Sequence, residues 1–256
     1  MNKRVLVTGS TKGIGQGILK KFHDENWDIC ITGRDSHQVL KIQNNLNEVR
    51  NDSAIGLGVD LGLKSDISKL LDFIKSRWGG LDCLVLNIGS GSGQKGLDTS
   101  FESNYLSVKI NFADVVNQFR VFSQLLENNK SGGDIIFIGS IAQASNVKAP
   151  YSYSYSKRAI SIFARHQALR LAAKKIAVNV INPGHIMTDE GTWSKRKKES
   201  LKNYNEFVSS NIPTGIIGEV ENVAELVFSL TNKKLNTMLT GENINIDGGT
   251  TINFYF

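Results

Sequence analysis

The sequence is poor in cysteine, proline and histidine. Its 256 residues include two cysteines, three prolines and four histidines. Cys30 and Cys83 lie far apart, each within an apolar run, a pattern that argues against a disulfide framework and against a cysteine metal site. We expect two buried thiols in a reducing cytoplasm. The histidines show no ligand spacing, so we predict no metal site.

Long apolar runs, targeting segments and linkers are also missing. No apolar run approaches the length that crosses a membrane. The first residues, MNKRVLVTG, pass from two basic side chains directly into a strand instead of forming a signal peptide. The chain has no Pro/Ser-rich linker, internal repeat or shift in composition. We therefore expect one domain over residues 1–256 and no membrane partner.

The charge of the chain is basic but dispersed. The net charge is +6 and the isoelectric point is near 9.2, which raises the question of a nucleic-acid partner. The basic residues are spread along the chain, however, and only residues 195–198, KRKK, form a cluster. A single cluster with no aromatic platform is typical of a solvated helix face. We expect no nucleic-acid partner.

Apolar, β-rich runs recur along the chain with helix-like segments between them. The runs are mostly continuous, which suits strands covered on both faces, and segments such as GQGILKKFHDEN have amphipathic helical spacing. The alternation predicts an α/β fold of the Rossmann type, a doubly wound parallel sheet of about seven strands. The predicted strands cover residues 3–8, 27–32, 53–59, 81–86, 134–139, 176–181 and 242–247.

A glycine turn, TGSTKGIG, covers residues 8–15 between the first predicted strand and the first predicted helix. Such a turn lets backbone N–H groups approach a pyrophosphate, which the positive end of the helix stabilises. Its spacing, G-x-x-x-G-x-G, differs from the general G-x-G-x-x-G fingerprint. Glycines also serve tight turns that bind no ligand. The position after the first strand favours a dinucleotide site.

This turn resembles the T-G-x-x-x-G-x-G motif of the short-chain dehydrogenase/reductase family, in its single-domain branch. The resemblance continues in order over nearly the whole chain. Leu86 and Ile88 depart from the family's usual N-N-A-G and affect the packing beside the nicotinamide ribose. The further matches are Asp60 beside the adenine, Asn87 and Gly89 after the fourth strand, Asn182-Pro183-Gly184 after the sixth, and Thr240-Gly241 with Asp247-Gly248-Gly249 near the end.

The resemblance implies a set of residues that bind the dinucleotide. They come from the glycine turn, from the ends of the following strands and from the catalytic helix. The implied cofactor-binding residues are Gly9, Ser10, Thr11, Lys12, Gly13, Ile14, Gly15, Arg34, Asp60, Leu61, Asn87, Gly89, Tyr153, Lys157, Pro183, Gly184, Ile186 and Thr188.

The end of the second strand indicates which dinucleotide binds. Enzymes that prefer NAD place an acidic residue there for the ribose 2′-OH. By the resemblance, Gly33 takes that position and Arg34 follows it, with Lys12 on the same side. The planar fork of arginine binds a phosphate at two points, which favours NADP over NAD. In the alternative, Asp35 is the ribose ligand, but we favour Asp35 as the N-cap of the next helix.

The run YSYSYSK, which ends at Lys157, alternates tyrosine and serine. The family's catalytic signature is Y-x-x-x-K, and residues four apart share one face of a helix. Tyr153 stands four residues before Lys157, whereas Tyr151 and Tyr155 would face roughly the opposite way. We therefore predict a helix that begins after Pro150. Tyr153 would carry the chemistry and the other two tyrosines would serve packing or the pocket rim.

The resemblance also implies a role for each catalytic residue. A phenol is a poor proton shuttle at neutral pH, so the Lys157 ammonium is expected to lower the pKa of Tyr153 and to hold the nicotinamide ribose. Ser140 would hydrogen-bond and polarise the substrate carbonyl, and Asn111 would support a water-linked proton path to the lysine. Each of these residues alone is ordinarily structural. The ordered set favours catalysis.

Other catalytic arrangements are weaker. No G-x-S-x-G elbow surrounds Ser140, which argues against a hydrolase. His185 is the histidine placed nearest the predicted cofactor site, and we interpret it as a loop side chain. The loop over residues 90–96 is small and polar, so we expect it to be mobile.

Residues 188–215 resemble the family's substrate-covering helices, and we predict a lid there that excludes water. Trp193, Tyr204 and Phe207 accompany the basic cluster in this segment. The basic residues hint at an anionic small-molecule substrate, such as a carrier-bound acyl thioester or a phosphorylated sugar. The resemblance also implies a homo-oligomer, most simply a homotetramer. The apolar end of the chain, residues 252–256, supports such an assembly.

The predicted function is an NADP-dependent oxidoreductase that transfers a hydride between the nicotinamide and a carbonyl or secondary alcohol, with a 3-oxoacyl thioester as one candidate substrate. Two alternatives stay open. One is a sugar-related dehydrogenase or epimerase of polysaccharide biosynthesis, whose branch usually has another glycine spacing and a longer C-terminal region. The other is a non-catalytic NADP-sensing regulator, although such relatives typically lose the catalytic tyrosine or lysine.

Overall fold

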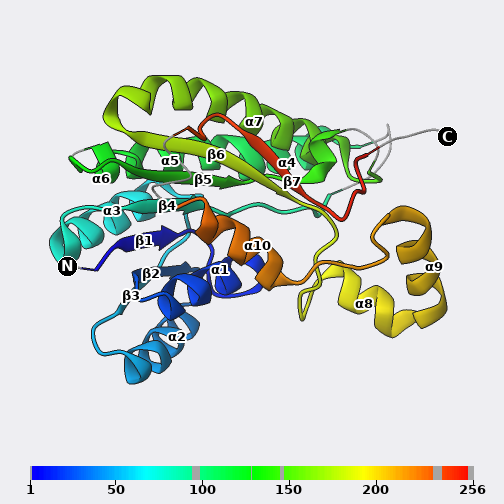
Figure 1. The fold of residues 1–256 in the computed structure, drawn as a ribbon, viewed down its shortest axis with the longest axis horizontal. Helices are drawn as coiled ribbons and strands as arrows, with labels where there is room; N and C mark the ends of the chain where they lie inside the picture. The colour runs from blue at the N-terminus through cyan, green and yellow to red at the C-terminus, as the bar shows by residue number, and fades with distance from the viewer. Residues whose placement is uncertain (1, 94–98, 128, 145–146, 233–237, 253–256) are drawn as a thin grey trace.

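A parallel sheet of seven strands forms the centre of the protein (Figure 1). The computed structural model describes residues 2–93, 99–127, 129–144, 147–232 and 238–252. The strand order β3-β2-β1-β4-β5-β6-β7 confirms the predicted doubly wound Rossmann-type fold. All seven predicted strands are present, namely β1 (Arg4–Val7), β2 (Asp28–Gly33), β3 (Ala54–Gly58), β4 (Cys83–Leu86), β5 (Gly133–Ile138), β6 (Ile176–Pro183) and β7 (Asn243–Ile246).

Helices cover both faces of the sheet because the strands are apolar on both sides. One face carries α1 (Gly13–Asp24), α2 (Ser36–Val49) and α10 (Val220–Ser229). The opposite face carries α3 (Lys64–Trp78), α4 (Phe101–Val108), α5 (Asp114–Phe122), α6 (Gln124–Glu127) and α7 (Tyr151–Leu171). Figure 1 shows α8 (Thr192–Glu199) and α9 (Leu201–Asn211) at the side, beyond one end of the strands.

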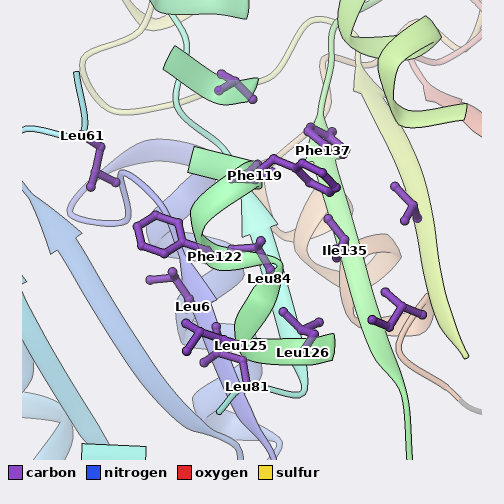
Figure 2. Close-up of a cluster of buried hydrophobic side chains, with 14 of the residues drawn as sticks. Leu6, Leu61, Leu81, Leu84, Phe119, Phe122, Leu125, Leu126, Ile135 and Phe137 are labelled. Carbon is purple, nitrogen blue, oxygen red and sulfur yellow. The ribbon is translucent and has the colours of Figure 1, made fainter. Parts of the chain in front are cut away.

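The larger of the two main apolar clusters lies between the sheet and helices α3, α5 and α7. Figure 2 shows Phe119 and Phe122 of α5 above the aliphatic side chains of β1, β4 and β5. The Phe119 ring lies 5.7 Å from that of Phe137 on β5 and 5.1 Å from that of Phe163 on α7. These contacts fix α5 and α7 on the sheet and so hold the residues at the ends of both helices in place.

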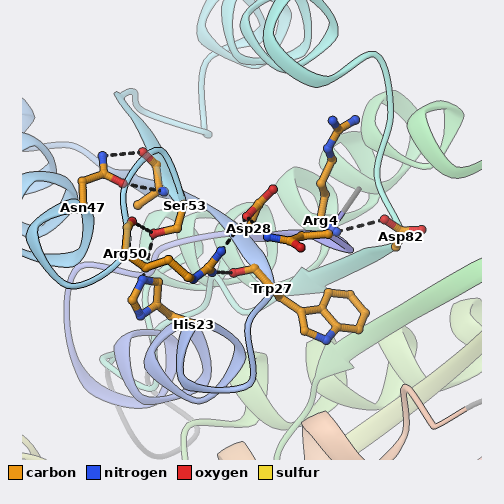
Figure 3. Close-up of polar contacts among 10 residues, drawn as sticks. Arg4, His23, Trp27, Asp28, Asn47, Arg50, Ser53 and Asp82 are labelled. Carbon is orange, nitrogen blue, oxygen red and sulfur yellow. Dashed lines mark hydrogen bonds and ion pairs between the residues drawn. The ribbon is translucent and has the colours of Figure 1, made fainter.

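A polar network closes the amino-terminal end of the sheet, opposite the candidate site (Figure 3). The Arg50 guanidinium forms an ion pair of 2.9 Å with Asp28 at the start of β2 and also donates to the Trp27 carbonyl. His23 at the end of α1 lies 2.9 Å from the Ser53 hydroxyl. Burial and the nearby Arg50 lower the pKa of His23. The network ties α1 and α2 to β2 and β3.

The order of the strands creates a crevice at their carboxyl ends. β1 pairs with β2 on one side and with β4 on the other. From β1 the chain continues to β2 and β3 on one side of the sheet, and from β4 it continues to β5, β6 and β7 on the other side. In open α/β sheets, this switch point is where ligands bind. The glycine turn follows β1, which brings it directly to the crevice.

Two segments named from the sequence fall partly outside the described residues. Residues 94–96 of the small polar loop and residues 253–256 of the apolar chain end are not described. Of these segments, residues 90–93 and Ile252 are described, and Ile252 is exposed. Within the described ranges, no helix has the length and apolar character that a membrane crossing requires.

Candidate active site

A pocket of about 1020 Å³ lies at the carboxyl ends of the strands. Its wall comes from the glycine turn, from the ends of β2 to β6, from the first turns of α7 and from the segment that leads into α8. The sequence-predicted residues in this wall are Gly9, Thr11, Lys12, Ile14, Gly15, Arg34, Asp60, Leu61, Asn87, Gly89, Ser140, Tyr153, Lys157, Pro183, Gly184, Ile186 and Thr188.

The glycine turn has a geometry that side chains would disrupt. Gly9 has a φ of 63°, in the region that favours glycine. A Cβ at Gly15 would collide with the Gly9 carbonyl oxygen and would lie 2.5 Å from Asn87 Nδ2. The Asn87 amide donates to the carbonyls of Thr8 and Gly9, each at 3.0 Å. The fourth strand therefore fixes the turn from the side.

The N-terminus of α1 opens onto this turn with no side-chain cap. Lys12 is the N-cap residue and its side chain accepts no hydrogen bond from the helix. The first N–H groups of a helix lack intrahelical partners and carry a partial positive charge. This end of α1 thus offers donors to an anion, and its donors suit a pyrophosphate.

Ser10 and Gly13 do not line the pocket. Ser10 is buried, its N–H donates to the Thr32 carbonyl at 2.9 Å, and its hydroxyl accepts from the Thr32 N–H at 3.1 Å. These bonds join the glycine turn to β2. Ser10 therefore holds the turn in place from behind, while the neighbouring Thr11 lines the pocket.

The end of β2 is shaped against an acidic residue. A Cβ at Gly33 would lie 2.5 Å from the side chain of Thr11, so a carboxylate at the position that binds the ribose in NAD enzymes would require the Thr11 side chain to move. Asp35 accepts from the N–H groups of His37 and Gln38 at 2.9 and 3.2 Å, which confirms it as the N-cap of α2. Arg34 is exposed and lines the pocket.

Asp60 marks the far end of the pocket, after β3. Its backbone N–H donates to Asp66 at 2.9 Å, and its own carboxylate accepts from the Gly62 N–H at 2.9 Å. These bonds fix the turn in which Leu61 is buried. The carboxylate of Asp60 keeps acceptor capacity for an exocyclic amine.

Helix α7 carries the catalytic candidates on one face. The predicted helix begins at Tyr151, directly after Pro150, and confirms that the tyrosine–serine alternation is not a strand. Tyr153 and Lys157 line the pocket, whereas Tyr151 and Tyr155 are 59% and 50% exposed. Of the three tyrosines, Tyr153, four residues before Lys157, is therefore the one that shares the pocket with the lysine.

The protonation of this pair is governed by burial. Lys157 is buried and donates to the Ile138 carbonyl at 2.9 Å, and burial lowers its pKa to about 8. Burial raises the pKa of Tyr153, and a hydrogen bond with Ser140 opposes this rise. The pKa of Tyr153 is thus raised and not lowered as predicted, because desolvation outweighs any effect of the lysine ammonium, which lies 5.8 Å from the ring centre.

Asn111 lies behind the pocket wall and not in it. It is fully buried, on a π-helical turn at Lys109–Ala113. Its amide donates to the carbonyls of Ser90 and Ser107 at 2.9 Å each, and its oxygen accepts from the Ser90 N–H at 2.8 Å. A Cβ at Gly89 would lie 2.9 Å from both Asn111 Oδ1 and Lys157 Nζ. The side-chain ends of Asn111 and Lys157 therefore both lie close to Gly89, where an added Cβ would force them to shift.

The two departures from the family's N-N-A-G pattern are packing residues. Leu86 is buried in the larger apolar cluster. Ile88 lines the pocket and packs on the glycine turn, with its Cγ1 3.0 Å from where a Cβ at Gly9 would stand. Both replacements leave Asn87 and Gly89 in place.

An aromatic group joins the segment after β6 to helices α8 and α9. The His185 ring centre lies 4.7 Å from that of Trp193 and 5.2 Å from that of Phe207. Arg196 stacks over Trp193 at 4.8 Å, so this member of the basic cluster is not merely solvated. Burial, followed by the charge of Arg196, lowers the pKa of His185. Trp193 also lines the pocket.

Sequence reasoning missed the part of the wall between α4 and α5. Lys109 forms an ion pair of 2.8 Å with Asp114 and donates to the Gly62 carbonyl at 3.4 Å. Gln118 is buried and donates to the Leu61 carbonyl at 3.2 Å. The π-helical turn changes which side chains share a face, so regular helical spacing does not find this group. In the sequence, only their proximity to Asn111 indicated that these residues belong to the pocket.

Comparison with known proteins agrees with this geometry. The model of the short chain dehydrogenase family matches residues 3–199. A glucose 1-dehydrogenase of Gluconobacter oxydans is 29% identical over 98% of this chain and 92% of its own length. A 3-oxoacyl-(acyl-carrier-protein) reductase of Buchnera aphidicola is 27% identical over 96% of each chain. The NADP complex of RhlG from Pseudomonas aeruginosa superposes with a TM-score of 0.87 at 25% identity, covering 98% of this chain and 96% of that one.

The chain belongs to the short-chain dehydrogenase family. Its class is that of NAD(P)-dependent oxidoreductases acting on CH–OH or C=O groups. Among the residues that the structure describes, no group of three His, Cys, Asp or Glu side chains gathers as a metal site would require.

Proposed function

We propose that this protein is an NADP-dependent oxidoreductase that interconverts a carbonyl and a secondary alcohol. The observation that carries the proposal is one pocket with three features. The uncapped end of α1 faces a glycine turn, Tyr153 and Lys157 project from one face of α7, and Arg34 lines the pocket directly after Gly33, the position where NAD enzymes have an acid.

The residues present suit the dinucleotide. Gly15 and Gly9 leave a cradle that a Cβ would fill, and the N-terminus of α1 would hold the pyrophosphate. Arg34 and Lys12 would bind the 2′-phosphate, and Asp60 would accept from the adenine amine. When bound, the nicotinamide supplies the hydride acceptor or donor. The bound NADP of RhlG supports this choice.

Tyr153 is the proposed proton donor for carbonyl reduction. Because burial raises its pKa, the phenol holds its proton at neutral pH, as a donor must. The Ser140 hydroxyl forms a hydrogen bond with this phenol, so the two hydroxyls lie close together. A substrate carbonyl oxygen placed between them would accept a hydrogen bond from each. The charged form of Lys157 would stabilise the phenolate left after proton transfer. Asn111 would fix the backbone of Ser90 and Ser107 without touching the substrate.

Residues 188–215 are the proposed lid, and the substrate site lies between this lid and Ser140. Trp193 gives this part of the pocket an aromatic wall. The candidate substrates are small ketones, sugar-derived carbonyls and 3-oxoacyl thioesters. The names of the glucose dehydrogenase and oxoacyl reductase relatives support the last two classes.

We also propose a cytoplasmic homo-oligomer. Both cysteines are buried free thiols, which suits a reducing compartment. Helices α4 and α7 pack together and expose Phe101, Tyr105 and Leu169, apolar side chains that a partner copy would cover. Light scattering tests this assembly, and a stable monomer at micromolar concentration would contradict it.

The function is tested by incubating the purified protein with NADPH or NADH and a panel of small ketones, keto-sugars and 3-oxoacyl thioesters. Loss of reduced-nicotinamide absorbance with at least one carbonyl, faster with NADPH, is the expected result. Binding of NADPH with no turnover on any class would favour a non-catalytic sensor. Faster turnover with NADH would contradict the cofactor assignment.

A further inference from the structure

An ion pair joins the glycine turn to the segment that follows β6. Lys12 Nζ lies 3.3 Å from Glu190 Oε2, between residues 178 positions apart in the chain. The turn over residues 188–191 presents Glu190, and the Gly191 N–H closes this turn on the Thr188 carbonyl at 3.0 Å. Thr188 and Gly191 both line the pocket.

The same lysine stands beside the end of β2, where the ribose 2′ position is expected. Thr11, the residue before Lys12, packs against Gly33. The Gln38 amide of α2 donates to the Thr11 carbonyl at 3.3 Å. Lys12 and Arg34 both line the pocket. An anion bound at this corner would therefore meet a lysine that is already paired with Glu190.

We propose that Glu190 determines cofactor specificity by competing with the 2′-phosphate of NADPH for Lys12. The inference rests on the proposed NADP-dependent function. A phosphate monoester brings close to two negative charges, so it attracts Lys12 and is repelled by the Glu190 carboxylate. The 2′-hydroxyl of NADH is neutral and meets neither effect. Glu190 thus reduces the ratio of NADPH affinity to NADH affinity, which Arg34 and Lys12 raise.

The expected size of the effect is small but measurable. The side chains of Lys12 and Glu190 are 75% and 80% exposed, so solvent screens their attraction. Exposed ion pairs of this kind alter an equilibrium by about two- to fivefold. Removal of the Glu190 charge should tighten NADPH by about that factor and leave NADH unchanged. Added salt should reduce the difference.

The test measures the dissociation constants of NADPH and NADH by titration calorimetry, which does not depend on turnover. The variants are Glu190→Gln, Lys12→Gln and their combination. Asp189→Asn is the matched control, because it removes the same charge one residue away and leaves the Lys12–Glu190 pair. We expect Glu190→Gln to tighten NADPH alone and Asp189→Asn to have less effect. In the Lys12→Gln background, Glu190→Gln should tighten NADPH by a clearly smaller factor, because only the direct repulsion between Glu190 and the phosphate is left to remove.

Each outcome separates the two claims. If the unaltered protein prefers NADPH and Glu190→Gln has no effect, or shifts both nucleotides equally, the role of Glu190 is refuted and the NADP proposal stands. A gain that is undiminished in the Lys12→Gln background also refutes competition for Lys12. If the unaltered protein binds NADH more tightly while Glu190→Gln still improves NADPH, the NADP proposal fails and the competition stands.

Discussion

Arg34 offers the most direct perturbation of cofactor choice. It lines the pocket immediately after Gly33, the position that carries the ribose carboxylate in NAD enzymes. A charge-assisted hydrogen bond is worth about 1.5–3 kcal/mol, which is about tenfold to a hundredfold in affinity. Arg34 is exposed, so solvent screening places its contribution at the lower end. Arg34→Ala should therefore lower kcat/KM for NADPH by about tenfold.

NADH provides the internal comparison, because it lacks the 2′-phosphate. Arg34→Ala should leave kcat/KM for NADH nearly unchanged, and the loss with NADPH should shrink as salt is added. Asp35→Ala is the control substitution. Asp35 is occupied in capping α2, so its loss should lower stability by about 0.5–2 kcal/mol with no change in cofactor preference. If Asp35→Ala damages NADH use and NADPH is poor throughout, Asp35 is the ribose ligand and the reasoning about Arg34 fails.

Three further predictions follow from the site and the fold. Gly15→Ala should abolish dinucleotide binding measured by calorimetry, because the added Cβ would stand 2.5 Å from Asn87. The helical signal in circular dichroism should be unchanged. Retained binding would show that the turn can relax. Carbonyl-reduction kcat/KM should fall as pH rises through about 8, where buried Lys157 loses its proton, and a profile flat well above that pH would contradict this role. Because the pKa of His23 is lower in the folded protein, the unfolded chain binds more protons once the pH drops below the ordinary histidine pKa. The free energy of unfolding in urea should therefore fall as the pH drops below that value. His23→Gln should make this pH dependence less steep, and an unchanged slope would refute the role of His23.

Local sequence signals sufficed where one interaction decides the structure. Mostly continuous apolar runs predicted β1 to β6 within a few residues, because strands buried on both faces have no polar side. The edge strand β7 is the exception, since its exposed and partly buried residues alternate. The spacing of four between Tyr153 and Lys157 predicted their shared helical face. Asp35 was predicted as a cap because a helix follows it at once.

Features that depend on tertiary contacts escaped the sequence. The π-helical turn around Asn111 shifts the helical pattern, which hid Lys109 and Asp114 from prediction. The pKa of Tyr153 depends on burial that no local pattern reports. The ion pair between Lys12 and Glu190 joins segments far apart in the chain, so only the fold brings them together.

The central claim is that Tyr153 donates the substrate proton and that its hydroxyl contributes little to the affinity for the dinucleotide. The most direct measurement is Tyr153→Phe, with turnover and NADPH affinity determined on the same preparation. The account predicts that turnover is lost while the dissociation constant of NADPH changes little. Tyr151→Phe and Tyr155→Phe, which alter the exposed tyrosines of the same helix, should keep most activity. Full turnover by Tyr153→Phe, or loss of turnover in Tyr155→Phe instead, would contradict the account.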